Sequence, residues 1–289
     1  MIVRNSGSFR LKLPFVRIVL AVALATPALA QMQLPGAVAP TEQGTTIRPA
    51  GPPKPKHAGP PPPPKTPGDD GLLNRTLEQN GRAGAIQFAM EGKDFRLSKL
   101  TFGGEKISRP SETCTVDATG MPLALTPVAK RNGVNRYAAA VGGCPIEFDV
   151  LEGAILVSPV AKACVFQAAD CRVDPAGLWG QPAKEIGPAR TKEIERARGP
   201  AEQTMRNRFR AWIEVAGKDR DMVRRISRYQ AGFSSDRAEV CDHYARESEH
   251  GYCALTLTQA RSIALGVRVA LPEMPPEPEN VPGRAKKKH

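Results

Sequence analysis

Aromatic residues and histidines are scarce in this sequence. Phe, Trp and Tyr together make up 5% of the 289 residues, and only four histidines are present. Proteins that bind single-stranded nucleic acid without sequence preference stack the bases on aromatic side chains. Because no cluster of aromatic residues could form such a platform, we do not expect nucleic acid as a partner.

Long apolar runs are also missing. The apolar stretch 18–24 is shorter than the roughly 20 residues that a membrane-spanning helix requires, and no later segment offers about twenty uncharged apolar residues. It is followed by Ala28-Leu29-Ala30 and preceded by four basic residues, Arg4, Arg10, Lys12 and Arg17. This order is typical of a secretory signal peptide. We therefore predict a signal peptide over residues 1–30, cleavage after Ala30, and a periplasmic or secreted protein without a membrane span.

Recognisable catalytic motifs are absent as well. The sequence contains no Gly-x-Ser-x-Gly segment, and His243 and His250 have no evident nucleophile to activate. A wall hydrolase could use two carboxylates, for which Glu247 and Glu249 are the candidate pair. Neighbouring acidic side chains in a loop are usually solvated, and a general acid needs a cleft and partial desolvation. We therefore predict a protein that is not an enzyme and has no cofactor, with wall hydrolysis as a weaker alternative.

The cysteines indicate an oxidising compartment. The sequence has six of them, all after the predicted signal: Cys114, Cys144, Cys164, Cys171, Cys241 and Cys253. An even number in an exported chain is typical of disulfides. Cys241 and Cys253, together with His243 and His250, could also form a zinc site, since zinc accepts two thiolates and two imidazoles. Export favours the disulfide over the metal site.

The most informative segment lies near the C-terminal end. Its key residues are Gln230, Phe233, Arg237, Cys241, Cys253, Thr258, Arg261 and Leu265. Steps of three and four place the first four of these on one stripe of a helix. Thr256 and Gln259 have the form of a capping box, which predicts that a second helix starts just after Cys253.

With these residues, the segment resembles the LprI-type lysozyme-inhibitor family. The resemblance covers about the last third of the chain, and it implies a small secreted helical domain, a Cys241–Cys253 disulfide and inhibition of a lysozyme. Proximity along the sequence favours Cys164–Cys171 and Cys114–Cys144 for the other cysteines, out of fifteen arrangements.

Composition divides the chain after the predicted signal peptide into four parts. Residues 31–70 are rich in proline and are predicted to form a disordered linker, and the tail 271–289 is predicted to be disordered too. Residues 71–182 are predicted to form a β-rich, disulfide-containing domain, and residues 188–270 an LprI-like helical domain. The fold class is therefore α+β, with a β-rich N-terminal domain followed by a disulfide-clamped three-helix domain.

Alternating apolar residues and glycine pairs support the β-rich part. Ile86, Phe88 and Met90 alternate with polar or small residues, and so do Ile146, Phe148 and Val150. Turns are predicted at three dipeptides: Gly103-Gly104, Asn132-Gly133 and Gly142-Gly143.

Three helices are expected in the helical part. The first begins near Ala189 and stops at Gly217, the second is capped by Asp219, and the third spans about 257–267. Short connections between them predict an antiparallel bundle.

Two sets of charged residues are candidate binding groups. Arg237 and Arg261 lie on inward stripes, where we expect them to brace the helices, with ligand contact as the alternative. The loop with Asp242, Glu247 and Glu249 is the candidate acidic contact for a basic lysozyme.

The charge balance suggests a different partner. Without the four cations of the signal, the formal charge falls from +12 to +8, and residues 181–270 hold 17 basic against 12 acidic groups. The basic helical surface is predicted to consist of Arg206, Arg208, Arg210, Arg220, Arg224, Arg225 and Arg228. Such a surface attracts polyanions. The leading hypothesis is thus an exported binding protein with a protein partner such as a lysozyme. The alternative is a cationic module that binds peptidoglycan or another anionic envelope polymer.

Overall fold

The computed structural model describes residues 65–118, 120, 123–160 and 162–270. The predicted signal peptide 1–30, the predicted linker up to residue 64, and the predicted tail 271–289 lie outside the described residues.

The folded region includes several residues before the predicted boundary at residue 71. Pro67 is buried, and the Asp69 carboxylate accepts hydrogen bonds from the Tyr137 hydroxyl at 2.6 Å and from Nδ2 of Asn135 at 3.0 Å. The 3-10 helix η1, Asp69–Leu72, follows. Since Asp69 is held by two side chains of the sheet, residues 67–70 belong to the folded region rather than to a disordered linker.

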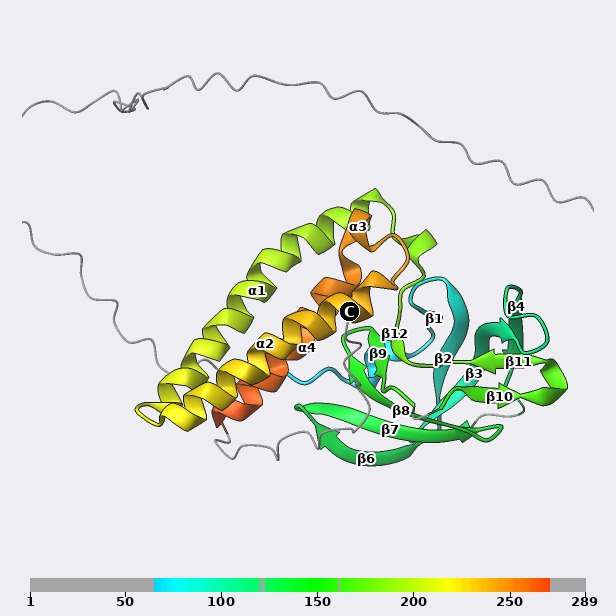
Figure 1. Cartoon of the computed structure of the whole chain (residues 1–289), viewed down its shortest axis with the longest axis horizontal. Coiled ribbons are helices and arrows are strands. Elements are labelled where there is room, and N and C mark those ends of the chain that lie inside the picture. The colour runs from blue at the N-terminus through cyan, green and yellow to red at the C-terminus, as the bar shows by residue number, and fades with distance from the viewer. Residues whose placement is uncertain (1–64, 119, 121–122, 161, 271–289) are drawn as a thin grey trace, which may run out of the picture. The chain divides into compact units, whose positions relative to one another are not determined.

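The β-rich part forms one antiparallel sheet of twelve strands within the described residues (Figure 1). The strands are β1 Leu77–Gln79, β2 Ala83–Glu91, β3 Asp94–Lys106, β4 Thr113–Asp117, β5 Leu123–Ala124, β6 Thr126–Arg131, β7 Val134–Val141, β8 Cys144–Leu151, β9 Ala154–Val157, β10 Cys164–Phe166, β11 Cys171–Val173 and β12 Gly177–Gly180. Their order is β10-β11-β3-β2-β1-β12-β9-β8-β7-β6, and β4 and β5 both pair with β3.

The core of the sheet follows the predicted alternation in β8. Ile146, Phe148 and Val150 are buried, whereas the intervening Glu147 is exposed. The Phe148 ring packs 5.6 Å from the ring of Phe88. Burying one such side chain stabilises the fold by roughly 1.5–3 kcal/mol, so the alternating residues supply much of what holds the sheet together.

Met90 lies in β2, as the alternation predicts, but it does not belong to the core. Ile86 and Phe88 are buried, but Met90 is 46% exposed. Met90 pairs with Phe95 one step from the end of the β2–β3 hairpin, where Glu91 pairs with Asp94. The alternating pattern therefore continues beyond the part of the strand that the core covers.

Two of the three predicted turns are confirmed. Asn132-Gly133 joins β6 to β7 and Gly142-Gly143 joins β7 to β8, and all four residues have positive φ. Gly103-Gly104, in contrast, lies inside β3, paired with Thr115 and Cys114. A Cβ on Gly104 would lie 2.2 Å from the carbonyl oxygen of Arg172. The glycine is needed there because two strands approach closely, not because the chain turns.

Two of the three proposed disulfide pairings are wrong. Cys114 bonds to Cys171, and Cys144 bonds to Cys164. Cys164 and Cys171 are close in sequence, but in the β10–β11 hairpin Cys164 lies opposite Val173 and Cys171 opposite Phe166. The two cysteines are therefore offset along the hairpin and do not face each other.

The observed pairings link distant strands instead. Cys114 and Cys171 lie opposite neighbouring parts of β3, at Gly104 and Lys106. The bond between Cys144 and Cys164 joins β8 to β10, which lie near opposite ends of the strand order. The sheet is therefore strongly curled, as Figure 1 shows.

The helical part contains α1 Pro188–Ala216, α2 Arg220–Asp242, the short α3 Glu247–His250 and α4 Tyr252–Ala270. The stop at Gly217 is confirmed, since its N–H bonds to the carbonyls of Ile213 and Glu214. The cap at Asp219 is also confirmed, since its side chain accepts from the N–H groups of Asp221 and Met222. No helix in the described part of the chain is long and apolar enough to cross a membrane. The fold is α+β, as predicted.

Helices and sheet share an apolar cluster. Leu151, Ala154 and Leu178 of the sheet are buried together with Ile194 of α1 and Leu255 of α4. A second cluster joins α1, α2 and α4 around Trp212, Ile226 and Leu265. The three long helices are thus packed on one another and on the sheet. The three disulfides indicate a non-cytoplasmic protein.

Candidate functional site

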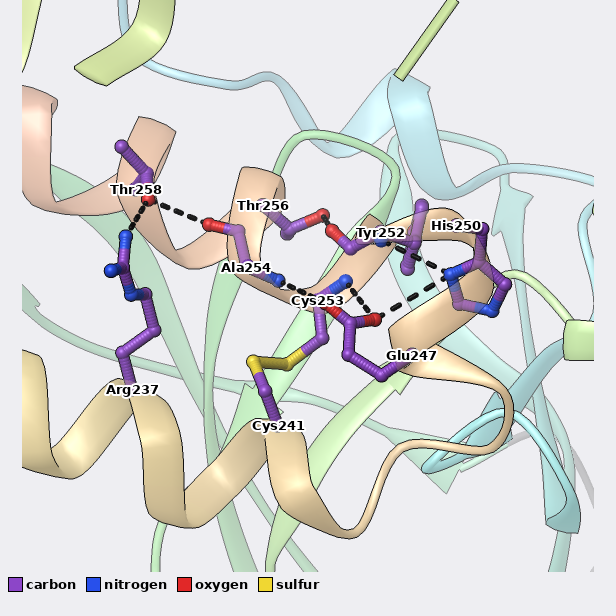
Figure 2. Close-up of a disulfide and its surroundings, with 9 residues drawn as sticks. All are labelled: Arg237, Cys241, Glu247, His250, Tyr252, Cys253, Ala254, Thr256 and Thr258. Carbon is purple, nitrogen blue, oxygen red and sulfur yellow. Dashed lines mark hydrogen bonds and ion pairs between the residues drawn. A yellow bond between two sulfur atoms is a disulfide. The ribbon is translucent and has the colours of Figure 1, made fainter. Parts of the chain in front are cut away.

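The predicted disulfide between helices is present at one end of the helical region. Cys241 lies in the last turn of α2 and Cys253 in the first turn of α4, with their Cα atoms 5.5 Å apart (Figure 2). Both residues are buried. We call this end, residues 241–253, the clamp. The pairing that the resemblance implied is confirmed.

Glu247 caps α4. Its two carboxylate oxygens accept the backbone N–H groups of Cys253 and Ala254, each at 2.9 Å (Figure 2). The N-terminus of a helix has unpaired N–H groups and a partial positive charge, so a carboxylate there is stabilising. The side chain is 17% exposed.

The predicted capping box is wrong. The helix begins at Tyr252, so Thr256 lies inside it, and its hydroxyl donates to the carbonyl of Tyr252 at 2.9 Å. Because Glu247, the first residue of α3, supplies the cap, α4 starts several residues before the predicted position near residue 257.

His250 is buried beside this cap. Its Nδ1 accepts the N–H of Tyr252 at 3.1 Å, so the ring proton is on Nε2, which donates to the carbonyl of Ala245 at 3.0 Å. Nδ1 is also 3.5 Å from a Glu247 oxygen, but in this tautomer the two do not form an ion pair.

The alternative zinc site is not formed. Its two cysteines are joined in the disulfide, and His243 is exposed while His250 is buried. Across residues 65–270, as far as they are described, no group of three or more His, Cys, Asp or Glu side chains could hold a metal ion.

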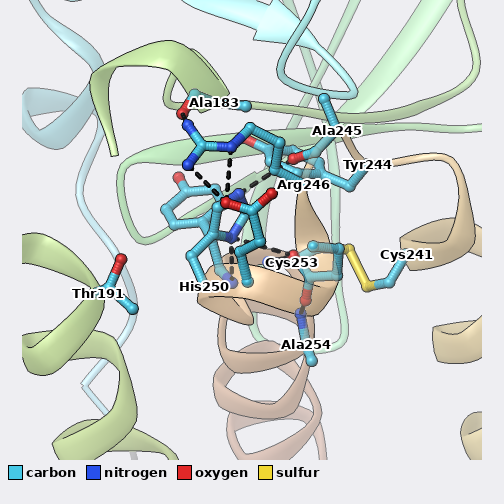
Figure 3. A network of polar contacts seen from close by, with 12 residues as sticks. Ala183, Thr191, Cys241, Tyr244, Ala245, Arg246, His250, Cys253 and Ala254 are labelled. Atoms are coloured by element: carbon cyan, nitrogen blue, oxygen red, sulfur yellow. Dashed lines mark hydrogen bonds and ion pairs between the residues drawn. A yellow bond between two sulfur atoms is a disulfide. The ribbon is translucent and has the colours of Figure 1, made fainter. Parts of the chain in front are cut away.

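Arg246 and Glu249 form an exposed pair at the same end. Nε and Nη2 of Arg246 donate to one Glu249 oxygen at 2.9 and 2.6 Å (Figure 3). The hydrogen bond from Arg246 lowers the pKa of Glu249, and the same bond raises the pKa of Arg246.

The structure gives the candidate acidic residues different partners. Glu247 binds backbone N–H groups and Glu249 binds Arg246, so each carboxylate has a separate partner within the fold. Asp242 is exposed and has no hydrogen bond or ion pair within the described residues. It is thus the one acidic group of the clamp that is free to meet a partner.

Two tyrosines connect the clamp to the sheet, and sequence reasoning missed both roles. The Tyr244 hydroxyl donates to the carbonyl of Gln181, and the Tyr252 hydroxyl donates to that of Gly153 at 3.3 Å. Burial raises the pKa of each tyrosine. The partner of Tyr244 lies 63 residues away in sequence, so no local pattern points to this contact.

Arg237 and Arg261 make the predicted bracing contacts. Nη1 of Arg237 donates to the Thr258 hydroxyl at 2.7 Å, which ties α2 to α4. Arg261 is 8% exposed, and it donates to the side-chain oxygen of Gln230 at 3.1 Å and to the carbonyl of Tyr229 at 2.7 Å. The alternative of a ligand contact stays a prediction.

The brace extends into a stack of arginines and aromatic rings. The guanidinium carbon of Arg261 lies 3.6 Å from the centre of the Tyr229 ring and 5.2 Å from that of Phe233. Arg268 lies 4.7 Å from the Tyr229 ring and 5.7 Å from the Trp212 ring. We call this stack the arginine ladder. Such contacts are worth about 0.5–2 kcal/mol each, and burial lowers the pKa of Arg261.

A second charged region lies at the connection between α1 and α2. Five exposed arginines lie within about three helical turns of this connection, on α1 and α2, and we call them the arginine tip: Arg206, Arg210, Arg220, Arg224 and Arg228. Figure 1 shows this connection at the opposite end of the helices from α3.

The arginine tip is only weakly neutralised. Arg206 pairs with Glu202 at 3.3 Å, and Arg224 pairs with Asp221 at 3.6 Å. Exposed pairs of this kind contribute little. Arg220 and Arg228 have no ion pair within the described residues. Most of the tip is therefore available to an anion.

Arg208 does not belong to the outer surface, contrary to prediction. Its Nη1 donates to the carbonyl and the hydroxyl of Ser262 on α4, at 2.9 and 3.1 Å, and burial lowers its pKa. The Ser262 groups face α1 at this point, so Nη1 of Arg208 is bound inside the helix contact, while its buried Nε has no hydrogen-bond partner. Arg225 is also only partly exposed.

Comparisons of the chain with family models, with curated proteins and with solved structures find no match. The likeness to the LprI type therefore rests on the eight residues from Gln230 to Leu265.

Proposed function

We propose that this protein is an exported, non-enzymatic binding protein that associates with an anionic polymer of the cell envelope through the arginine tip. The observation that supports this proposal is the concentration of exposed, weakly paired arginines at one end of the helices. A polyanion that contacts these arginines releases its condensed counterions, which favours binding at low salt. A guanidinium can also bind a phosphate or carboxylate through two parallel hydrogen bonds.

Sedimentation with purified peptidoglycan tests the proposal. The full exported chain, with its disulfides intact, is incubated with the polymer over a series of NaCl concentrations. We expect the retained fraction to fall as salt rises, because the attraction is electrostatic. The triple variant Arg220→Gln, Arg224→Gln, Arg228→Gln should show lower retention and a salt slope reduced by up to about three.

A matched variant controls for net charge. Lys93, Lys99 and Lys130 are exposed on the sheet, and changing all three to Gln alters the charge of the chain by the same amount. This variant should be retained like the unmodified chain. Equal losses in the two triple variants would contradict a local site, and retention that does not respond to salt would contradict electrostatic binding.

Inhibition of a lysozyme is the second candidate function. It is supported by the LprI-like residues and by Asp242, the free carboxylate of the clamp. Many lysozymes are strongly basic, so a chain of net charge +8 gains no long-range attraction to them, and contact has to rely on a local acidic group.

A turnover assay with a lysozyme and a cell-wall suspension tests this second candidate. Inhibition that weakens on Asp242→Asn, but not on Glu195→Gln at an exposed position of α1, would favour it over polymer binding. A chain that leaves lysozyme turnover unchanged at micromolar concentration would exclude it.

A further inference from the structure

A polar cleft lies between the sheet and the beginning of α1, away from the arginine tip. Its volume is about 610 Å³, and its lining includes Arg75, Glu152, Gln181, Glu185, Arg190 and Tyr252. These residues come from five separate segments: the chain before β1, the β8–β9 turn, the segment after β12, α1 and the first residue of α4. A cleft of this size can hold a small molecule.

Charges of both signs line the cleft without neutralising each other. Arg75, Glu152 and Glu185 are exposed and have no ion pair within the described residues. Arg190 pairs only with Glu193, which lies one turn further along α1, at 2.9 Å, with both side chains about half exposed. Two cations and two anions are thus open to a ligand in one cleft.

The two arginines lie near the hydroxyl of Tyr252. Tyr252 is 4% exposed, and its oxygen accepts the N–H of Gln181 and donates to the carbonyl of Gly153, both at 3.3 Å. Burial raises the pKa of Tyr252, while Arg190 and Arg75 both act in the opposite direction. Arg75, Arg190 and Tyr252 thus line the same cleft, with the buried hydroxyl of Tyr252 facing a positive environment.

The start of α1 adds to the positive side of the cleft. The N-cap residue Gly187 has no side chain that could accept the first N–H groups of the helix. A long helix has a partial positive charge at this end, which attracts a carboxylate.

We propose that this cleft binds a short peptide with a free amine and a free carboxylate. The carboxylate would lie between Arg75 and Arg190, beside the Tyr252 hydroxyl, and the ammonium group would contact Glu152 or Glu185. A simple anion would leave the two glutamates without a partner, and a simple cation would leave the two arginines without one. A sugar ring would require an exposed aromatic face, but the one aromatic residue lining the cleft, Tyr252, is buried. The proposal uses none of the residues of the arginine tip, so the two can fail separately.

Calorimetric titration of the full exported chain with the dipeptide Ala-Ala tests the proposal. Two blocked dipeptides serve as probes of each end: N-acetyl-Ala-Ala lacks the ammonium group and Ala-Ala-amide lacks the carboxylate. We expect Ala-Ala to bind and each blocked form to bind roughly tenfold to hundredfold more weakly, because each loses a charge-assisted hydrogen bond.

Substitutions inside and outside the cleft test whether Ala-Ala binds there. The double variant Arg75→Gln, Arg190→Gln should lose at least tenfold in affinity for Ala-Ala. Arg196→Gln, an exposed position of α1 that does not line the cleft, should leave the affinity unchanged. Unfolding curves of all variants check that the fold is retained. The proposal is overturned if Ala-Ala does not bind at millimolar concentration, if the double variant binds as well as the unmodified chain, or if N-acetyl-Ala-Ala binds as tightly as Ala-Ala.

Discussion

The two ends of the helical region use their charged side chains in different ways. At the clamp, Glu247 caps a helix, His250 bonds to the backbone on both sides of its ring, and Glu249 is paired with Arg246. At the arginine tip, the guanidiniums are exposed and weakly paired. The comparison teaches that charge near a recognisable sequence pattern can be entirely structural, while the charge available to a partner lies elsewhere.

The largest expected effect comes from removing the clamp disulfide. Changing Cys241 and Cys253 to Ser should lower the free energy of unfolding by about 3 kcal/mol, because the bond restricts the unfolded chain. Urea unfolding followed by circular dichroism measures this loss. Retention on peptidoglycan should remain under native conditions, and its loss would show that the two ends are not independent.

The next effect concerns the arginine ladder. Arg261→Met should lower the free energy of unfolding by about 2 kcal/mol, because the buried oxygens of Gln230 and Tyr229 lose their donor. Arg261→Lys should recover only part of this loss, since an ammonium group lacks the planar fork that serves two acceptors while stacked on a ring. Urea unfolding of the two variants compares them, and full recovery by Lys would show that only the charge matters.

A smaller effect separates the two glutamates of the clamp. Glu247→Gln should lower the free energy of unfolding by about 1 kcal/mol, since an amide offers one acceptor oxygen to two N–H groups at a helix end. Glu249→Gln, two residues away on the exposed side, should leave the thermal midpoint almost unchanged. Equal losses would mean that Glu247 does not act as the cap of α4.

The smallest effect is a pH dependence. Because Arg246 lowers the pKa of Glu249, their contact stabilises the fold above the ordinary glutamate pKa, and the contribution disappears as the pH falls through the lowered value. NMR titration of the Glu249 carboxylate should report this lowered pKa, and Arg246→Gln should return it to the ordinary range. An unchanged pKa in that variant would assign the shift to another group.

Local signals in the sequence predicted local structure well. The alternation in β8, the Asn132-Gly133 turn, the cap at Asp219 and the stop at Gly217 depend on residues close in sequence. Arg237 and Arg261 were placed correctly as a brace because helical spacing alone directs them inward.

Predictions that depended on contacts between distant elements of the fold were wrong. Cys144 and Cys164 meet because the sheet curls, and no spacing in the sequence encodes that curvature. The cap of α4 was misplaced for a related reason, since Glu247 reaches the helix from the short helix α3 rather than from the N-cap position. The contact of Tyr252 with Gly153 spans 99 residues, so the cleft beside it could not be assembled from the sequence.

The arginine ladder has a consequence for the direction of the exposed arginines. Arg261 stacks on Tyr229 and also lies near Phe233, one turn further along the same helix. Rotation of α2 about its own axis would separate both rings from the guanidinium at once. The ladder therefore fixes the angular orientation of α2, and by holding Tyr229 toward α4 it keeps Arg224 and Arg228 facing the solvent.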